Sequence, residues 1–334
     1  MTNRKVSDFA WGFGLITNYL DDDGTNVVLD SWFPKAHTGN HEELESATKE
    51  TQEPEMARKL LKIAEADATA KTRGVVREVR FVSTNLKTAP ENAESVYLRL
   101  HALSMRLVKP NTINLDGLFA LLENVVWTNF GPCSPKNFDE TRLGLAEQNS
   151  EKFGAGVNVI SVDKIPRMVD YVVPSGVRVA DTNRVRLGAH LAPGTTVMHE
   201  GFVNFNAGTI GTSMVEGRIS QGVVVGDGSD IGGGASIMGT LSGGGKHVIS
   251  IGRRSLLGAN AGIGISLGDD CIVEAGLYIT AGTKILLDDE IRKGKELSGA
   301  NGLLFRRNSQ SGAIEAILRA HKPGVELNSA LHTN

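Results

Sequence analysis

Aliphatic residues recur at every sixth position through much of the second half of the chain. An α-helix would repeat near every 3.6 residues and a half-buried strand every 2, so a period of six indicates neither element. Four such series follow one another, which is typical of a repeat architecture. They are Val179, Val185, Leu191, Val197 and Val203; Ile219, Val225, Ile231 and Ile237; Ile251, Leu257 and Ile263; and Leu267, Val273, Ile279 and Ile285.

Several hexads also share an internal form: an aliphatic residue, glycine, two variable residues and a small residue, as at 231–235 and 257–261. This form predicts a triangular solenoid in which each hexad makes one flat side and one corner, and three hexads complete a coil. The aliphatic and small residues should face inward, and glycine should relieve the backbone at the turn. Successive coils should stack by parallel hydrogen bonding at about 4.8 Å.

Two long breaks separate successive series. Val203 and Ile219 are sixteen residues apart, and Ile237 and Ile251 are fourteen apart. Residues must therefore be looped out or deleted within 208–220 and within 239–250. The second break contains the glycine-rich run 241–246, which could act as a lid, and loops on a rigid scaffold often carry the chemistry.

The first half of the chain is typical of mixed α/β structure. Strands are expected at 12–16, 27–29, 74–83 and 157–162, helices at 54–66, 94–107 and 115–126, and a surface loop at 38–53. Beyond Ile285 the chain predicts a hairpin, with strands at 303–308 and 313–318 joined by a turn at 309–312. We therefore expect three parts: an α/β domain at 1–165, a solenoid at 166–287, and a C-terminal hairpin and tail at 288–334.

Composition narrows the class of protein. The 334 residues include 39 Gly and only 5% aromatic residues, so the core should consist of small and aliphatic side chains. The net charge of −3, without a long basic run, argues against nucleic-acid binding. Two cysteines do not make a disulfide framework, and no apolar run approaches the ~18 residues that span a bilayer. The first residues lack an apolar signal core, so the cytoplasm is the expected location.

The repeats resemble the hexapeptide-repeat acyltransferases, whose coils are left-handed, and a left-handed parallel β-helix is therefore expected. Longer strings are similar to one family, the tetrahydrodipicolinate N-succinyltransferases. They are PRMVDYVVP (166–174), TVMHEGFVN (196–204), SMVEGRIS (213–220), GGGASIMGT (232–240), LSGGG (241–245), VEAGL (273–277) and LLFRRN (303–308). YLRLH (97–101) and NVVWTN (124–129) resemble the N-terminal domain of its longer, actinobacterial-type branch.

The resemblance implies succinyl transfer from succinyl-CoA to the amino group of hydrated, ring-opened tetrahydrodipicolinate, in diaminopimelate and lysine biosynthesis. Such a reaction needs a base near the amine, donors for the thioester oxyanion and cations for the carboxylates. By the family motif Glu216 is the catalytic residue, either as a general base or through a transient acyl anhydride. Arg218 would bind a carboxylate of substrate or succinyl group. Without the resemblance, Glu216 would be interpreted as a solvated corner carboxylate and Arg218 as a surface ion-pair partner.

The resemblance also implies sites for the acyl donor. In this family the pantetheine arm lies between two solenoids, so a homotrimer is expected. Lys293 and Arg306 match cationic positions for the CoA phosphates, although solvated surface charges would explain them equally well. The positions that match the pantetheine groove are Gly233, Ser236, Ala259, Glu274, Ala275 and Gly282; the solenoid itself would require small residues at the same places.

Three further residues have competing interpretations. Many hexapeptide acyltransferases use histidine as the base, which makes His199 the rival of Glu216. Glu200 matches one ligand of a divalent ion on the trimer axis, but its usual aspartate partner is Asn183 here. Because Mg²⁺ prefers carboxylate and water to an amide, a tightly bound metal is not expected. Cys271 should be inert core.

Other functions on the same scaffold remain open. Acetyl transfer to the same or a related amine is the main alternative. A γ-type carbonic anhydrase needs three histidines on one zinc ion, and His190, His199 and His247 lack its local spacing. A non-catalytic ice-binding or scaffold protein would show repeated threonines on one outward face, a pattern that is missing here.

Overall fold

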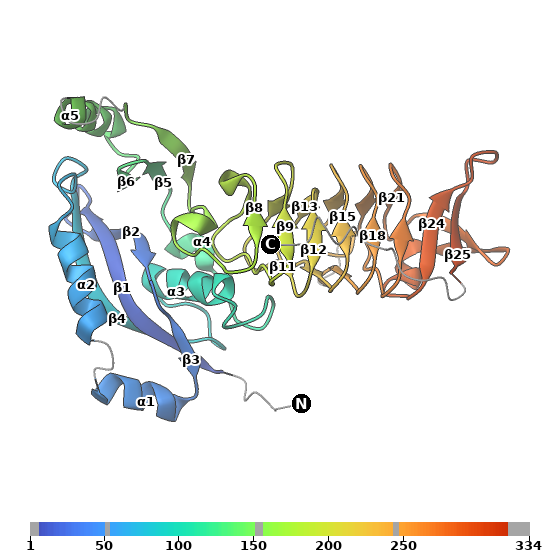
Figure 1. Ribbon diagram of the computed structural model, residues 1–334, viewed down its shortest axis with the longest axis horizontal. Coiled ribbons are helices and arrows are strands. Elements are labelled where there is room, and N and C mark those ends of the chain that lie inside the picture. Colours follow the sequence, from blue (N-terminus) through green and yellow to red (C-terminus); the bar gives the residue numbers. More distant parts are fainter. Residues whose placement is uncertain (1–6, 51–53, 151–155, 243–246, 320–334) are drawn as a thin grey trace. The chain divides into compact units, whose positions relative to one another are not determined.

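The computed structural model describes residues 7–50, 54–150, 156–242 and 247–319 (Figure 1). The chain forms two compact units. Unit 1 contains Met1–Val108, Thr112–Pro166 and Asp170–Val172, and unit 2 contains Lys109–Asn111, Arg167–Val169 and Val173–Asn334. Among the described residues, no helix has both the length and the apolar character needed to cross a membrane.

Unit 1 is built on an antiparallel sheet around one long central strand. This strand, β1 (Phe9–Leu20), pairs with β2 (Asn26–Trp32), β3 (His37–Gly39) and β4 (Val75–Asn85). A second antiparallel sheet has the order β6 (Gly131–Cys133), β5 (Val125–Thr128) and β7 (Val159–Asp163). The four strands expected in this half of the chain are therefore confirmed as parts of β1, β2, β4 and β7.

The expected helices α2 (Pro54–Glu65) and α3 (Ala93–Ser104) are also confirmed. Asn92 caps α3, because its side chain accepts the N–H of Ser95 while the Ser95 hydroxyl reaches back to the backbone. Along α3, His101 is fully buried: its Nε2 accepts the N–H of Phe33 at 3.2 Å, and its Nδ1 lies 2.7 Å from the carbonyl of Tyr97. Burial lowers the pKa of His101 to about 4, so the ring is neutral at pH 7.

Two expectations for unit 1 are wrong. The described part of the expected loop, residues 38–50, is not a loop, because it includes the end of β3 and helix α1 (His41–Glu50). The helix starts where Asn40 and Glu43 cap each other's N–H groups, although its sequence offers almost no apolar face. Residues 115–126 are not one helix either: only α4 (Leu118–Leu121) is helical, and Val125 already belongs to β5. Helix α5 (Phe138–Ser150) was not predicted.

Unit 2 is a parallel β-helix with three faces, and Figure 1 shows its short strands stacked coil upon coil. The first face carries β8 (Arg178–Val179), β9 (Thr195–Val197), β12 (Ser213–Val215), β15 (Asp230–Ile231), β18 (Leu256–Leu257) and β20 (Ile272–Val273). The second carries β10 (Phe202–Val203), β13 (Arg218–Ile219), β16 (Ser236–Ile237), β19 (Gly262–Ile263) and β21 (Tyr278–Ile279). The third carries β11 (Gly208–Thr209), β14 (Val224–Val225) and β17 (Ser250–Ile251).

The period of six correctly identified the interior of unit 2. Every aliphatic residue of the four series except the half-buried Val179 is buried, and the small residues four places on are buried as well. Ser229, Ser255 and Cys271 form a hydrogen-bonded column inside one corner. Burial raises the pKa of the Cys271 thiol, which fits an inert core position.

The two long register breaks have opposite origins. Val203 pairs with Ile219 and Val215 with Ile231, so the coil that contains Glu216 has 16 residues, and its side from Val215 to Ile219 is two residues short. The second break is an insertion, because Ile237 pairs with Ile263 across 26 residues. A bridge between Thr240 and Val248 closes the base of the inserted segment.

The end of the described chain completes the first face. The predicted hairpin is confirmed as β24 (Leu303–Arg307) and β25 (Ile314–Leu318), and Val273 pairs with Phe305 of β24. A second hairpin, β22 (Lys284–Leu287) and β23 (Glu290–Lys293), was not predicted. It is followed by the 3₁₀ turn Gly294–Leu297.

Candidate active site

Glu216 lies at the shortened corner of the β-helix. We call the segments that lead from the first to the second face the first corner; they are residues 198–201, 216–217, 232–235, 258–261 and 274–277. The neighbouring coils have four residues in this corner, whereas the coil of Glu216 has two. The backbone N–H of Glu216 donates to the carbonyl of Ile231 at 2.8 Å, which fixes Glu216 to the next coil.

The side chain of Glu216 has no partner of its own in the described part of the chain. It is half-buried, and its carboxylate makes no hydrogen bond or ion pair with a described residue. Most carboxylates that are partly withdrawn from water are paired. An unpaired carboxylate at a notch is available to accept a proton or to attack a carbonyl carbon.

Because the coil of Glu216 has two residues fewer at this corner, Glu200 and Gly233 on either side of it approach each other. Glu200 belongs to the preceding coil and Gly233 to the following one. The Glu200 Oε2 atom lies 3.7 Å from the position that a Cβ atom on Gly233 would take. The carboxylate of Glu200 therefore extends past the coil of Glu216, so two acidic side chains are gathered at the same corner.

Arg218 lies on the second face, immediately beyond this corner. Its backbone N–H is bound by Ala235 at 2.8 Å, and its Nη2 donates to the Oγ atom of Ser236 at 2.5 Å. The guanidinium group is exposed. It keeps further N–H donors in a planar fork that matches a carboxylate.

The small residues expected to line a groove fall into a column along the first corner. Gly233, Ala259 and Ala275 take equivalent places in successive coils. The carbonyl of Gly233 accepts the N–H of Asn260, and the carbonyl of Ala259 accepts the N–H of Gly276. Glu274 is exposed, and its Oε2 atom accepts the N–H of Arg307 at 2.7 Å. This column of small side chains leaves backbone accessible along the corner.

One expectation about these residues is wrong. The β-helix does not require glycine at position 233 or 282, because neither has a positive φ and an added Cβ would meet nothing closer than 3.7 Å at Gly233 and nothing within 4 Å at Gly282. By contrast, a Cβ on Gly232 would lie 2.7 Å from the nitrogen of Ala259. Gly233 and Gly282 therefore have no steric reason to be glycine within this chain.

Gly282 and Lys293 lie at a different edge of the second face. We call the segments leading from the second to the third face the second corner; they include the described residues 220–223, 238–242, 247–249, 264–266 and 280–283. Hydrogen bonds from Gly294 to Thr283 and from Lys295 to Ala281 hold the β22–β23 hairpin against this corner. The Oγ atom of Ser242 in the insertion accepts the N–H of Ala281 at 2.7 Å, so the base of the insertion lies here as well.

The antiparallel hairpin adds a cation that the sequence did not suggest. Lys284 is the direct cross-strand partner of Lys293, and both are exposed. Like charges in such a pair repel each other, and a bound anion would relieve that repulsion. Arg306 differs, because its Nε and Nη2 atoms both donate to Glu315 at 3.1 Å.

The residues matched to an axial metal site, Glu200 and Asn183, make a weak ligand set. The Oδ1 atom of Asn183 accepts from Arg167 at 3.3 Å, and the guanidinium group of Arg184 donates to the carbonyl of Glu200 at 2.8 Å. The amide oxygen of Asn183 is thus already engaged by a cation, which weakens it further as a ligand for a divalent ion. In the described ranges, no group of three or more His, Cys, Asp or Glu side chains is arranged to hold a metal ion.

A cavity of about 480 Å³ opens at the second corner. Asn111 and Asn206 bind each other there, with the Asn111 N–H donating to Asn206 Oδ1 at 2.8 Å. The other lining residues are Asn204, Ser220, Gln221, Gly222, Gly239, Thr240 and Val248. The lining is neutral and rich in amides.

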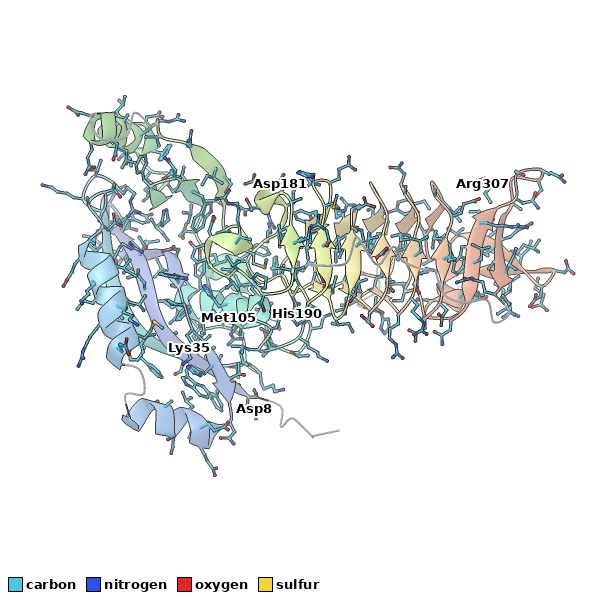
Figure 2. The ribbon with its side chains drawn as sticks, in the orientation of Figure 1. Asp8, Lys35, Met105, Asp181, His190 and Arg307 are labelled. Atoms are coloured by element: carbon cyan, nitrogen blue, oxygen red, sulfur yellow. The ribbon has the colours of Figure 1, made fainter. Side chains whose placement is uncertain are left out.

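His199, the rival base, is exposed and lies in the first corner. Figure 2 labels Asp181 and Arg307, which lie at opposite ends of the β-helix.

Comparisons with known proteins agree on one family. Residues 248–281 match the family model "Hexapeptide repeat of succinyl-transferase", and residues 122–167 match "Tetrahydrodipicolinate N-succinyltransferase middle". The 2,3,4,5-tetrahydropyridine-2,6-dicarboxylate N-succinyltransferase of Vibrio cholerae is 59% identical over 251 residues, covering 73% of this chain and 71% of the relative. That of Pseudomonas aeruginosa is 58% identical over 252 residues, covering 74% and 71%.

A solved structure from Campylobacter jejuni, assigned as a 2,3,4,5-tetrahydropyridine-2-carboxylate N-succinyltransferase, matches with a TM-score of 0.76 at 34% identity. The match covers 95% of this chain and 93% of that one, so it includes both units. The expected actinobacterial-type branch stays a prediction. The repeat architecture, the matched segments and the identity over most of the chain lead to one conclusion: this chain belongs to the tetrahydrodipicolinate N-succinyltransferase family.

Proposed function

We propose that this chain transfers succinyl from succinyl-CoA to the amino group of hydrated, ring-opened tetrahydrodipicolinate, and that Glu216 is the catalytic residue. The observation that carries the proposal is the half-buried, unpaired carboxylate of Glu216 at the one shortened first corner of the described coils. The reaction belongs to diaminopimelate and lysine biosynthesis.

In the transfer, the amine nitrogen forms a bond to the thioester carbonyl carbon while it gives up a proton. Glu216 accepts that proton as a general base, and the tetrahedral intermediate then expels CoA as a thiolate, which regains a proton. The same carboxylate could instead attack first and carry the succinyl group as a mixed anhydride. The enzyme is incubated with succinyl-CoA alone, and the unreacted thioester is then removed by gel filtration. Only the anhydride route leaves succinyl on the protein, which hydroxylamine then releases as a hydroxamate.

Binding of the acyl donor follows from the column of small residues. The pantetheine arm would lie along Gly233, Ala259 and Ala275, where the accessible backbone can exchange hydrogen bonds with its amides. The CoA phosphates would be bound by Lys284 and Lys293, whose charges lie side by side. Ser236, which binds Arg218, lies between these two regions on the second face.

The separation of these residues supports a homotrimer. The column of small residues lies along the first corner, whereas Gly282 and Lys293 lie at the second corner, on the opposite edge of the second face. One extended CoA molecule can contact both sets if it lies between two neighbouring β-helices. Analytical ultracentrifugation should show an active trimer, and an active monomer would contradict this assembly.

The activity is tested by measuring release of CoA thiol with tetrahydrodipicolinate and either succinyl-CoA or acetyl-CoA. We expect the succinyl donor to react with the higher kcat/KM. Faster transfer of acetyl would support the alternative acetyltransferase, and no transfer from either donor would contradict the proposed function.

A further inference from the structure

The second face carries one row of outward-pointing residues that runs along the β-helix. Register pairs Phe202 with Arg218, Arg218 with Ser236, Ser236 with Gly262, and Gly262 with Tyr278. Each step is one coil, about 4.8 Å. The row begins beside the shortened corner of Glu216 and ends at a tyrosine.

The ring of Tyr278 lies over Gly262. A Cβ atom on Gly262 would be 2.0 Å from Cε2 and 2.2 Å from Cδ2 of that ring, far closer than any real contact. Gly262 has an ordinary φ and is buried, whereas Tyr278 is 44% exposed. Glycine is therefore needed at position 262 to let the ring lie flat against the coil that precedes its own.

Arg218 extends in the opposite direction along the same row. Its guanidinium group reaches the Oγ atom of Ser236, one coil beyond its own backbone. The guanidinium group thus lies over the coil of Ser236 and the aromatic ring over the coil of Gly262, which is the next coil. A cation and an apolar wall are placed about one coil apart.

Next to this row, the surface over Gly264 is covered by the side chains of Ser242 and Met238. A Cβ atom on Gly264 would lie 2.8 Å from Cβ and Oγ of Ser242 and 2.9 Å from Sδ of Met238. Ser242 is held there because its N–H donates to the carbonyl of Gly264 at 3.0 Å. The ring of Tyr278 and the start of the insertion therefore bound the surface beyond Ser236.

A short chain with an apolar middle and a carboxylate end is complementary to this arrangement. We infer that Tyr278, held in place by Gly262, determines acyl specificity: its ring packs against the two methylene groups of the succinyl chain, while Arg218 binds the free carboxylate. This inference rests on the proposed function. It adds Tyr278 as a residue that discriminates succinyl from shorter acyl chains.

The test compares kcat/KM for succinyl-CoA and acetyl-CoA in the wild type and three variants. Tyr278→Ala should lower kcat/KM for succinyl-CoA about tenfold, a usual effect of lost methylene contacts, and should change that for acetyl-CoA less than about twofold. Tyr278→Phe keeps the ring and should retain the wild-type ratio. Gly262→Ala leaves the tyrosine in the sequence but displaces its ring, so it should reproduce the effect of Tyr278→Ala.

Ile210→Ala is the matched control, because Ile210 is also 44% exposed but lies beyond the third face. It should leave kcat/KM unchanged for both donors, and circular dichroism should show that each variant is folded. Equal losses with both donors, or no loss in Tyr278→Ala, would overturn the inference. A wild type that transfers no succinyl would instead overturn the proposed function, so the two failures are distinguishable.

Discussion

The Glu200 Oε2 atom lies 3.7 Å from the position of a Cβ on Gly233, although a whole coil separates the two residues. The contact is possible because the intervening coil lacks two residues at its first corner. Glu216 lies in that shortened corner. A deletion in the repeat, and not an added loop, thus creates the notch in which the candidate catalytic carboxylate lies.

Gly233→Ala and Gly232→Ala form a matched pair that separates binding from folding. Gly233→Ala should fold normally, since 3.7 Å is an ordinary contact, and should raise the KM for succinyl-CoA by narrowing the notch. Gly232→Ala should lower stability by about 1–3 kcal/mol, because its Cβ would meet backbone at 2.7 Å. Urea unfolding and steady-state kinetics check both; an unchanged KM in a folded Gly233→Ala would contradict the groove assignment.

Glu216→Gln should lower kcat by at least about 10²-fold, since the amide can neither accept the proton nor attack the thioester. The KM for succinyl-CoA should change little. His199→Ala is the control for the rival base and should retain much more activity, and both variants should keep the oligomeric state of the wild type. The reverse ranking would overturn the assignment of Glu216 while leaving the fold intact.

Arg218→Ala should act mainly on a KM. A guanidinium group that binds a carboxylate contributes to the ground state and the transition state alike. Because Arg218 is inferred to bind the succinyl carboxylate, the KM for succinyl-CoA should rise more than the KM for tetrahydrodipicolinate, which steady-state kinetics with each substrate varied in turn will check. A large fall in kcat with both KM values unchanged would contradict a binding role.

The double variant Lys284→Ala/Lys293→Ala should raise the KM for succinyl-CoA several-fold. It should leave the KM for succinyl-pantetheine unchanged, because this donor lacks the nucleotide phosphates. Arg306→Ala should have a smaller effect, because Glu315 already compensates its charge. Kinetics with both donors check this. Equal loss with the two donors would show that the lysines do not act through phosphate.

Exhaustive chelation should leave the activity nearly unchanged. The Asn183 amide oxygen already accepts from Arg167, so the chain offers a poor ligand set for Mg²⁺ at this place. Activity is measured after treatment with EDTA and after Mg²⁺ is restored. A major loss that Mg²⁺ reverses would contradict the prediction.

Acidification should destabilise the protein through His101. The folded-state pKa of about 4 is below the unfolded value near 6.5, so the unfolded state binds more protons between these values. Stability should therefore fall by at most about 3 kcal/mol as pH drops from 6.5 to 4. In urea unfolding at several pH values, His101→Gln should show a shallower dependence, and an equal dependence would contradict this origin.

The sequence by itself determined the repeat and its inside. Aliphatic side chains every six residues can be buried together only if three hexads close a coil, and Ile231, Leu257 and Val273 indeed stack in one column. The motif around Glu216 also allowed the catalytic residue and its neighbours to be proposed. In unit 1 the strands and the two apolar helices were predictable from periodicity, whereas α1 and α5 have too few regularly spaced apolar residues to be recognised.

Tertiary structure decided what spacing cannot specify. A break in the period does not reveal whether residues were deleted or inserted, and only the pairing of Val203 with Ile219 and of Ile237 with Ile263 separates the two cases. Lys284 meets Lys293 because a hairpin reverses the chain, and Tyr278 covers Gly262 from sixteen residues away because one coil has that length. Side chains from different coils become neighbours through backbone hydrogen bonds between coils, and the register of those bonds is set by the whole packed β-helix and by no local run of sequence.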